Sequence, residues 1–433
     1  MGEHGKPLLA VSAEQAAKFD ENARQVAIKI RQLNLAVLDS MSLQVQVVGS
    51  GRETEAGTKS PPPQKRSTSS YFQKKRVPGR LTSLPDIETY FPTERDRHLY
   101  TYSHLARETH QIRLFSLSPQ TAQGHVQGTF HKLNLASLPR YTALSYTWGD
   151  PRDLHEIVID NFKTIKVRKN LFDFLQRQSS IITEPKYFWI DAVCINQSNM
   201  TERNHQVSLM KDIYVQAHEV YIWLGPEKEN SDLAMDYLAM EGSRGLRRRG
   251  PGYYPLWKGE QGQALVHLCE RPYWRRMWII QEIAHAGKIT VWCGSKSVEW
   301  SLIEQLYLTL KTLEDESWWA HHQHAIAVLQ SAAAVMVWQR AHWRHARTST
   351  PTLKTLIEIF RDWRCVDVRD KVFALLSMAS ESTAIEANYS MAPRDIYFAV
   401  RDKHPDAGWV FDNLLSQVLG LSHRDIQLNG QDL

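Results

Sequence analysis

Two apolar runs separated by an amphipathic stretch form the clearest structural pattern in this chain. The runs, Tyr187–Ile190 and Val220–Leu224, have the length and continuous hydrophobicity of strands buried on both faces. Between them, residues 200–217 carry apolar side chains at helical spacing. Asn199 is placed to cap this helix, with Glu202 three positions later as the reciprocal partner. A strand, a helix and a second strand in this order predict a parallel βαβ unit.

Shorter patterns predict further strands and helices on both the N-terminal and the C-terminal side of this unit. A turn signal at Thr147–Pro151 ends one strand, and a short helix is predicted over Asn170–Gln178. The remaining predicted strands are Ile112–Phe115, Tyr141–Tyr146, Ile157–Ile159, Ile165–Val167 and Ile289–Trp292. Beyond Trp300 the predicted elements are the helices Ser301–Glu314, Ala320–Ala346, Thr352–Trp363 and Asp370–Ala379. The predicted fold class is α/β, a parallel sheet flanked by helices.

Changes in composition divide the chain into segments. Pro61–Pro63 and the basic piece Lys74–Arg76 lie in a stretch rich in Ser and Thr, which is typical of a disordered linker. The basic pieces fit a nuclear-targeting patch, although a solvated linker accounts for them more simply. The predicted segments are an N-terminal helical segment (1–48), a low-complexity basic linker (49–100), an α/β domain (101–299) and a helical C-terminal region (300–433).

Charge and cysteine content limit the classes of partner. The 433 residues include 52 Lys and Arg against 47 Asp and Glu, and this balance demands neither a nucleic acid nor a membrane. The four cysteines form no CxxC pair, which argues against a zinc cluster. Arg247–Arg249 lie in a Gly/Pro loop that could hold a phosphate, but a solvated loop is favoured and nucleic acid is not an expected partner. With no signal peptide or membrane-length apolar stretch recognised, we expect a cytoplasmic protein, or a nuclear one through the basic linker.

The run Trp274–Glu282 is the strongest candidate for chemistry. It is predicted to be helical, and Trp274, Trp278 and Glu282 then share one face. Two tryptophans on that face indicate burial, and a buried carboxylate is either paired or functional because an isolated buried charge is costly. Pairing with Arg275 or Arg276 is the commoner structural outcome.

Several motifs together resemble the fungal heterokaryon incompatibility (HET) domain. The resemblance rests on their order and spacing more than on any one motif. The motifs are YTALSYTWG at residues 141–149, WIDAVCINQ at 189–197, VYIWLG at 220–225, YWRRMWIIQE at 273–282 and, downstream, CVDVRDKVFALL at 365–376. The resemblance implies a role in fungal non-self recognition and programmed cell death.

HET domains are similar, remotely, to Toll/interleukin-receptor (TIR) domains, so the resemblance implies a TIR/flavodoxin-like sheet. Ser145, Asp191, Trp278 and Glu282 are placed like residues of the TIR pattern, in which the Glu of W-x-x-x-E is the catalytic residue of NAD⁺ cleavage. The chain departs from that pattern where Arg275, Arg276 and Ile279 replace smaller residues near the Trp, and a long insertion precedes them. The implied fold therefore transfers more safely than the implied activity.

The implied reaction needs few groups. Cleavage of the nicotinamide–ribose bond passes through a ribosyl cation, which one fixed carboxylate, Glu282, could stabilise. NAD⁺ would be the substrate, with no cofactor or metal required. Residues expected to bind it lie at carboxyl ends of strands or near Glu282. They are Ser145, Trp148, Asp191, Asn196, Gln197, Arg275, Arg276 and Trp278.

Each of these residues also has a structural interpretation. Trp148 is either a core aromatic or a stacking platform. Asp191 could bond loop N–H groups, and Asn196 and Gln197 could be turn and cap residues. Cys194, in an apolar context, is predicted to be an inert buried thiol. The histidines between His321 and His345 fit a solvated helix better than a metal site.

Two functional hypotheses follow. The first is a TIR-like NAD⁺ glycohydrolase that triggers cell death after self-association. The second is a non-catalytic signalling module that works by self-association alone, with Glu282 as a structural ion-pair partner. Both predict a homo-oligomer on activation and an incompatibility partner protein.

Overall fold

The computed structural model describes residues 98–122, 124–160, 162–240, 259–313, 323–345, 350–380 and 385–427. The predicted helical segment 1–48, nearly all of the predicted linker, the Arg247–Arg249 loop, and His321 and His322 lie outside the described residues.

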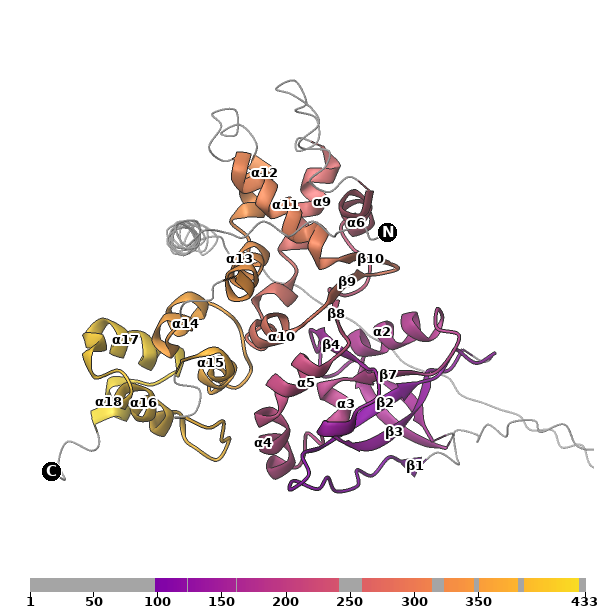
Figure 1. Cartoon of the computed structure of the whole chain (residues 1–433), viewed down its shortest axis with the longest axis horizontal. Coiled ribbons are helices and arrows are strands. Elements are labelled where there is room, and N and C mark those ends of the chain that lie inside the picture. Colours follow the sequence, from indigo (N-terminus) through magenta and orange to yellow (C-terminus); the bar gives the residue numbers. More distant parts are fainter. Residues whose placement is uncertain are drawn as a thin grey trace, which may run out of the picture.

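One ten-stranded sheet lies at the centre of the N-terminal part of this structure (Figure 1). Its strand order is β1-β6-β5-β3-β2-β7-β4-β8-β9-β10. The strands are β1 (His98–Leu99), β2 (Gln111–Leu117), β3 (Gln127–Asn134), β4 (Thr142–Tyr146), β5 (Leu154–Ile159), β6 (Lys163–Arg168), β7 (Lys186–Trp189), β8 (Glu219–Trp223), β9 (Ile289–Cys293) and β10 (Lys296–Glu299).

The predicted α/β fold class is confirmed, but the sheet is mixed. Strands β7, β4, β8 and β9 pair in parallel, whereas β2–β3, β2–β7, β5–β6 and β9–β10 are antiparallel. Within the parallel part, the first strand along the chain, β4, lies between the second, β7, and the third, β8. This is the beginning of the 2-1-3-4 order of flavodoxin-like sheets, in which ligands bind at the carboxyl ends of the strands.

Two strands that the hydrophobic pattern did not predict, β3 and β10, are largely polar. Strand β3 leaves most of its residues half-buried or exposed, and its pairing with β2 depends on Gly128. A Cβ at Gly128 would lie 2.4 Å from the carbonyl oxygen of Ser116 and 2.5 Å from the ring of Phe115. This strand is therefore specified by close backbone approach to a neighbour rather than by its own periodicity.

Helices cover the sheet and build the C-terminal region. The helices of the described residues are α2 (Lys169–Ser179), α3 (Asp191–Cys194), α4 (Met200–Ser208), α5 (Met210–Gln216), α6 (Ser231–Met240), α9 (Glu260–Cys269), α10 (Ile279–His285), α11 (Trp300–Leu313), α12 (Gln323–Leu329), α13 (Ala332–His345), α14 (Leu353–Phe360), α15 (Asp370–Phe373), α16 (Pro393–Asp402), α17 (Gly408–Val418) and α18 (His423–Gln427). The predicted helix 200–217 is interrupted at Leu209, and Asn199 caps its first part by accepting from the Glu202 N–H at 3.0 Å.

The prediction of one helix over Trp274–Glu282 was wrong. Residues Pro272–Arg275 form a 3-10 helix, η3, and Arg276 is extended before α10 begins at Ile279. The break has a tertiary cause, because Arg276 forms a β-bridge with Arg364 from the C-terminal region. The Met277 N–H donates to the Arg364 carbonyl at 2.9 Å, and the Arg364 N–H donates to the Arg275 carbonyl at 2.5 Å.

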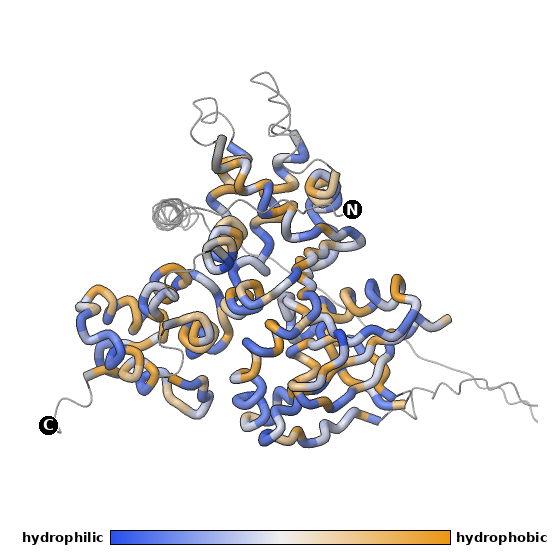
Figure 2. Tube along the Cα trace, viewed as in Figure 1, coloured by the Kyte–Doolittle hydropathy of each residue, from blue (hydrophilic) through white to orange (hydrophobic). Residues whose placement is uncertain are grey.

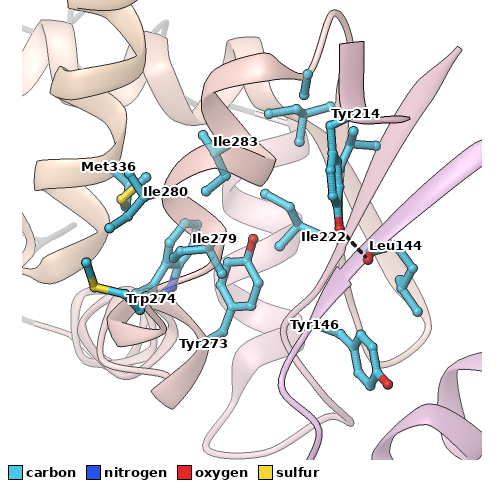
Figure 3. Packing of buried hydrophobic residues seen from close by; sticks show 14 of the residues in the cluster. Leu144, Tyr146, Tyr214, Ile222, Tyr273, Trp274, Ile279, Ile280, Ile283 and Met336 are labelled. Carbon is cyan, nitrogen blue, oxygen red and sulfur yellow. Dashed lines mark hydrogen bonds between the residues drawn. The ribbon is translucent and has the colours of Figure 1, made fainter. Parts of the chain in front are cut away.

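The buried core is continuous from the sheet into the C-terminal helices. A single cluster of buried apolar side chains includes residues from Ile112 to Leu419, and Figure 2 shows that both regions contain many apolar segments. In α13, the buried Arg340 donates to the Ile283 carbonyl and, at 2.7 Å, to the Ala286 carbonyl. In Figure 3, Ile280 of α10 faces Met336 of α13. Helix α10 is therefore held from both sides, by the sheet and by the C-terminal region.

Candidate functional site

Glu282 lies at the contact between α10 and strand β4. Its carboxylate accepts a hydrogen bond from the Ser145 hydroxyl, and the Ser145 oxygen lies 2.7 Å from the Tyr273 hydroxyl. All three side chains are buried, and Glu282 is only 2% exposed. Figure 3 shows Tyr273 and Ile279 filling the space between α10 and the strands. The carboxylate is therefore held by the Ser145 hydroxyl, which in turn contacts the Tyr273 hydroxyl from a separate element.

Burial dominates the electrostatics of Glu282. Desolvation raises the pKa of its carboxyl group to about 7, although Arg276 and the Ser145 hydrogen bond oppose the rise. The charge of Asp191 adds to it. Among the described residues, neither Arg275 nor Arg276 lies within ion-pair distance of this carboxylate. The structural ion pair considered above is thus not formed.

Arg276 joins the two acidic groups of the cluster. Its guanidinium donates to the Tyr146 carbonyl at the end of β4 and interacts electrostatically with both Glu282 and Asp191. Arg276 is half-buried as a residue, whereas Glu282 is almost fully buried. A guanidinium beside two carboxylates carries the N–H donors that an anion-binding group needs.

Asp191 and Trp148 form the outer part of the cluster. The Trp148 indole N–H donates to the Asp191 carboxylate at 2.8 Å, and the Arg168 guanidinium lies 5.1 Å from the centroid of the Trp148 ring. Burial raises the pKa of Asp191, opposed by Arg276 and the Trp148 hydrogen bond. Gly149, with φ of +83°, turns the chain after Trp148. Trp148 is partly exposed, so it is a surface aromatic rather than a fully buried core residue.

The strand order explains why these residues meet. Ser145 and Tyr146 end β4, and Asp191 follows the end of its parallel neighbour β7. Parallel strands place their carboxyl ends at one edge of the sheet. The cluster thus gathers at the carboxyl ends of β4 and β7, and β4 is also the strand at which the chain order changes direction toward β8.

Four predicted site residues lie outside this cluster. The Asn196 side chain accepts from the Ser198 N–H and hydroxyl, and is a turn residue. Gln197 is exposed and donates to the Asp191 carbonyl at 2.8 Å. Arg275 contributes its backbone carbonyl to the bridge with Arg364. Trp278 precedes α10 and hydrogen-bonds Asp370 of the C-terminal region.

A buried ion pair supports the loop that carries Asp191. Arg113 of β2 donates to Glu202 at 2.7 Å and to the Cys194 carbonyl at 2.8 Å, and Glu202 accepts from the Asn196 N–H at 2.8 Å. Glu202 therefore serves this network rather than closing the predicted capping box. Burial raises the pKa of Cys194 to about 12, as expected for an inert thiol.

Sequence reasoning missed Tyr273 and Arg168 as members of the cluster. Tyr273 lies within the YWRRMWIIQE motif, so its position carried a signal, but its contact with Ser145 depends on the break before α10. Arg168 had no signal, because only the β5–β6 hairpin and the start of α2 bring it to Trp148. Across the described ranges, no group of three or more His, Cys, Asp or Glu side chains could hold a metal ion.

None of the helices within the described ranges is long and apolar enough to cross a membrane.

Comparison with known proteins identifies the segment that contains this cluster. The family model of the heterokaryon incompatibility protein (HET) matches residues 141–282, from Tyr141 of the first motif to Glu282. The chain is also 28% identical over 253 residues to heterokaryon incompatibility protein 6, OR allele, of Neurospora crassa. That match covers 48% of this chain and 37% of the relative's length. No solved structure matches the chain. Residues 141–282 are therefore similar to the HET family, and the chain spans well under half of this relative's length.

Proposed function

We propose that this HET-domain protein acts in fungal non-self recognition and cell death, by cleaving NAD⁺ at Glu282. One observation carries the proposal for chemistry. Glu282 is a buried carboxylate whose pKa is raised to about 7, it has no ion-pair partner among the described residues, and it lies near the carboxyl ends of parallel strands, where sheets of this kind commonly bind ligands. Perturbed carboxylates gathered with cations and an aromatic ring are typical of functional sites.

The reaction uses only groups of the cluster and water. The bond between ribose C1′ and the nicotinamide nitrogen breaks, and its electron pair neutralises the cationic ring. Ionised Glu282 stabilises the ribosyl cation, and water adds to C1′ with release of a proton. Arg276 and Arg168 would hold phosphate oxygens, and Trp148 offers a partly exposed face to a base. Nicotinamide and ADP-ribose are the products.

In this proposal, self-association of the protein controls whether the substrate can reach Glu282. The carboxylate is 2% exposed, so a substrate reaches it only after movement of the segment that carries Arg276 and Trp278. That segment is tied to the C-terminal region by the Arg276–Arg364 bridge. We propose that assembly of several copies releases this tie.

The test compares the full chain with Glu282→Gln. NAD⁺ loss and nicotinamide release are measured by chromatography in cells that express each protein, together with cell survival. Glu282→Gln keeps the hydrogen bond from Ser145, so it is expected to fold, to stop NAD⁺ loss and to abolish toxicity. Glu156→Gln makes the same change at an exposed residue of β5 and is expected to act like the unaltered chain.

A non-catalytic self-associating module is the second candidate, and the burial of Glu282 favours it. If Glu282→Gln stays fully toxic while NAD⁺ levels do not change in either protein, the enzymatic proposal fails and the module remains. Loss of toxicity without any NAD⁺ cleavage by the unaltered chain would lead to the same conclusion.

A further inference from the structure

A cavity of about 360 Å³ opens at the opposite end of the sheet from Glu282. Thr142, Lys186 and Glu219, the first residues of β4, β7 and β8, all line it. Thr142 and Ser145 lie three residues apart on β4, a separation of roughly 10 Å in a strand. The cavity is therefore a separate site, and nothing assigned to the Glu282 cluster accounts for it.

The charge in this cavity is mainly positive. The Lys186 ammonium lies 2.7 Å from the Tyr221 hydroxyl and 4.1 Å from the centroid of that ring. Within the described ranges, no carboxylate forms an ion pair with Lys186 or Arg140. The one carboxylate of the lining, Glu219, is already bound by Lys288 at 3.2 Å and by the Thr290 hydroxyl. Arg140 and Lys186 thus line the cavity without a carboxylate at ion-pair distance, although the charge of Glu219 still acts on Lys186 from farther away.

Arg140 is held in place by His218. The Arg140 guanidinium contacts the His218 Nε2 atom, and because arginine nitrogens only donate, this ring nitrogen is the acceptor. This contact uses one terminal nitrogen of the Arg140 guanidinium, and the remaining N–H groups of the guanidinium can donate to a ligand. Burial lowers the pKa of Lys186, as expected for an ammonium that lacks a carboxylate at contact distance.

We propose that this cavity binds a small phosphate-bearing organic molecule, with its phosphate between Arg140 and Lys186. The planar guanidinium of Arg140, from the loop before β4, and the ammonium of Lys186, from β7, match a doubly charged phosphate monoester. The volume falls in the range of about 300–1,000 Å³ that is usual for small-molecule sites, and exceeds what an inorganic ion needs. Tyr187 and Tyr221 supply the apolar walls for the organic part. Since the site shares no residue with the Glu282 cluster, the proposal stands or falls independently of NAD⁺ cleavage.

Calorimetric titration of the full chain tests this site, with AMP, ribose 5-phosphate and inorganic phosphate as probes. We expect at least one of the two organic phosphates to bind more tightly than inorganic phosphate. Lys186→Met and Arg140→Gln are each expected to weaken that binding at least tenfold. Lys166→Met, at an exposed lysine of β6, should leave it unchanged. Arg276→Gln should also leave it unchanged, which separates this cavity from the Glu282 cluster.

Three results would overturn the proposal. They are no binding of either organic phosphate at millimolar concentration, binding that Lys186→Met and Arg140→Gln both leave intact, and binding lost only in Arg276→Gln. Circular dichroism of each variant checks its fold. Arg140 is exposed, so its variant keeps the test valid even if Lys186→Met fails to fold.

Discussion

Replacing Glu282 with Gln is expected to stabilise the protein at neutral and alkaline pH. Burial raises the pKa of this carboxyl group from its usual 4.5 to about 7. Between these values the unfolded chain has lost the proton and the folded chain still holds it. Stability therefore falls as pH rises from 4.5 to 7, and the full cost is present above pH 7. At roughly 1.4 kcal/mol per pH unit, this cost is about 3 kcal/mol.

Glutamine has no charge at any pH, and its side-chain oxygen still accepts the hydrogen bond from Ser145. Glu282→Gln should therefore be about 3 kcal/mol more stable than the unaltered chain at pH 8, and equally stable near pH 4.5. Urea unfolding of both proteins at several pH values between 5 and 8 measures the difference directly. Other groups that titrate in this range are common to both proteins and cancel in the comparison.

Glu156→Gln provides the control, since this carboxylate is exposed on β5 and its replacement should not change the pH dependence. A constant difference in stability across the pH range would refute the raised pKa. A Glu282→Gln protein that is less stable than the unaltered chain at pH 8 would show that the carboxylate is stabilised by a partner that the geometry does not reveal.

Three further predictions follow from the same structure. If the chain cleaves NAD⁺, its kcat should rise with pH through about 7 as Glu282 ionises. Ser145→Ala removes a hydrogen bond that lowers the pKa of Glu282, so it should move the midpoint of the pH–kcat profile to higher pH. A kcat that does not change between pH 6 and 8 would exclude Glu282 as the ionised group. Burial lowers the pKa of His285 from its usual 6.5 to about 4, so the folded protein loses stability as pH falls from 6.5 to 4. His285→Gln should restore up to about 3 kcal/mol of the free energy of unfolding at pH 4, measured with urea. Arg113→Met leaves Glu202 buried without its partner and should cost about 3–5 kcal/mol in urea unfolding, whereas an effect below 1 kcal/mol would show that the loop bearing Asp191 does not depend on this pair.

Local patterns in the sequence predicted the elements that bury continuous apolar side chains. The runs Tyr187–Ile190 and Val220–Leu224 became β7 and β8. The runs Ile157–Ile159 and Ile165–Val167 lie in the paired strands β5 and β6, where Ile157 is opposite Ile165. These elements are specified by their own hydrophobicity, which does not depend on a partner. The polar strand β3 had no such signal, because its pairing with β2 on one side and with β5 on the other makes it a strand.

The candidate site was predictable in its members but not in its geometry. The motifs placed Ser145, Asp191 and Glu282 at strand ends or near them, and a parallel sheet brings such ends together. The break at Arg276 was not predictable, because Arg364, far along the chain, supplies the bridge that ends the helical spacing. The Tyr273 hydroxyl that contacts Ser145 comes from η3, on the N-terminal side of that break.

By itself, the sequence determined the fold class and the set of side chains able to do chemistry, because hydrophobic periodicity and motif spacing are local properties. Only the tertiary structure decided whether Glu282 is paired, exposed or buried. That state depends on groups from β4, η3 and the C-terminal region together. Its raised pKa follows from desolvation by all of them, and no local pattern in the sequence encodes that burial.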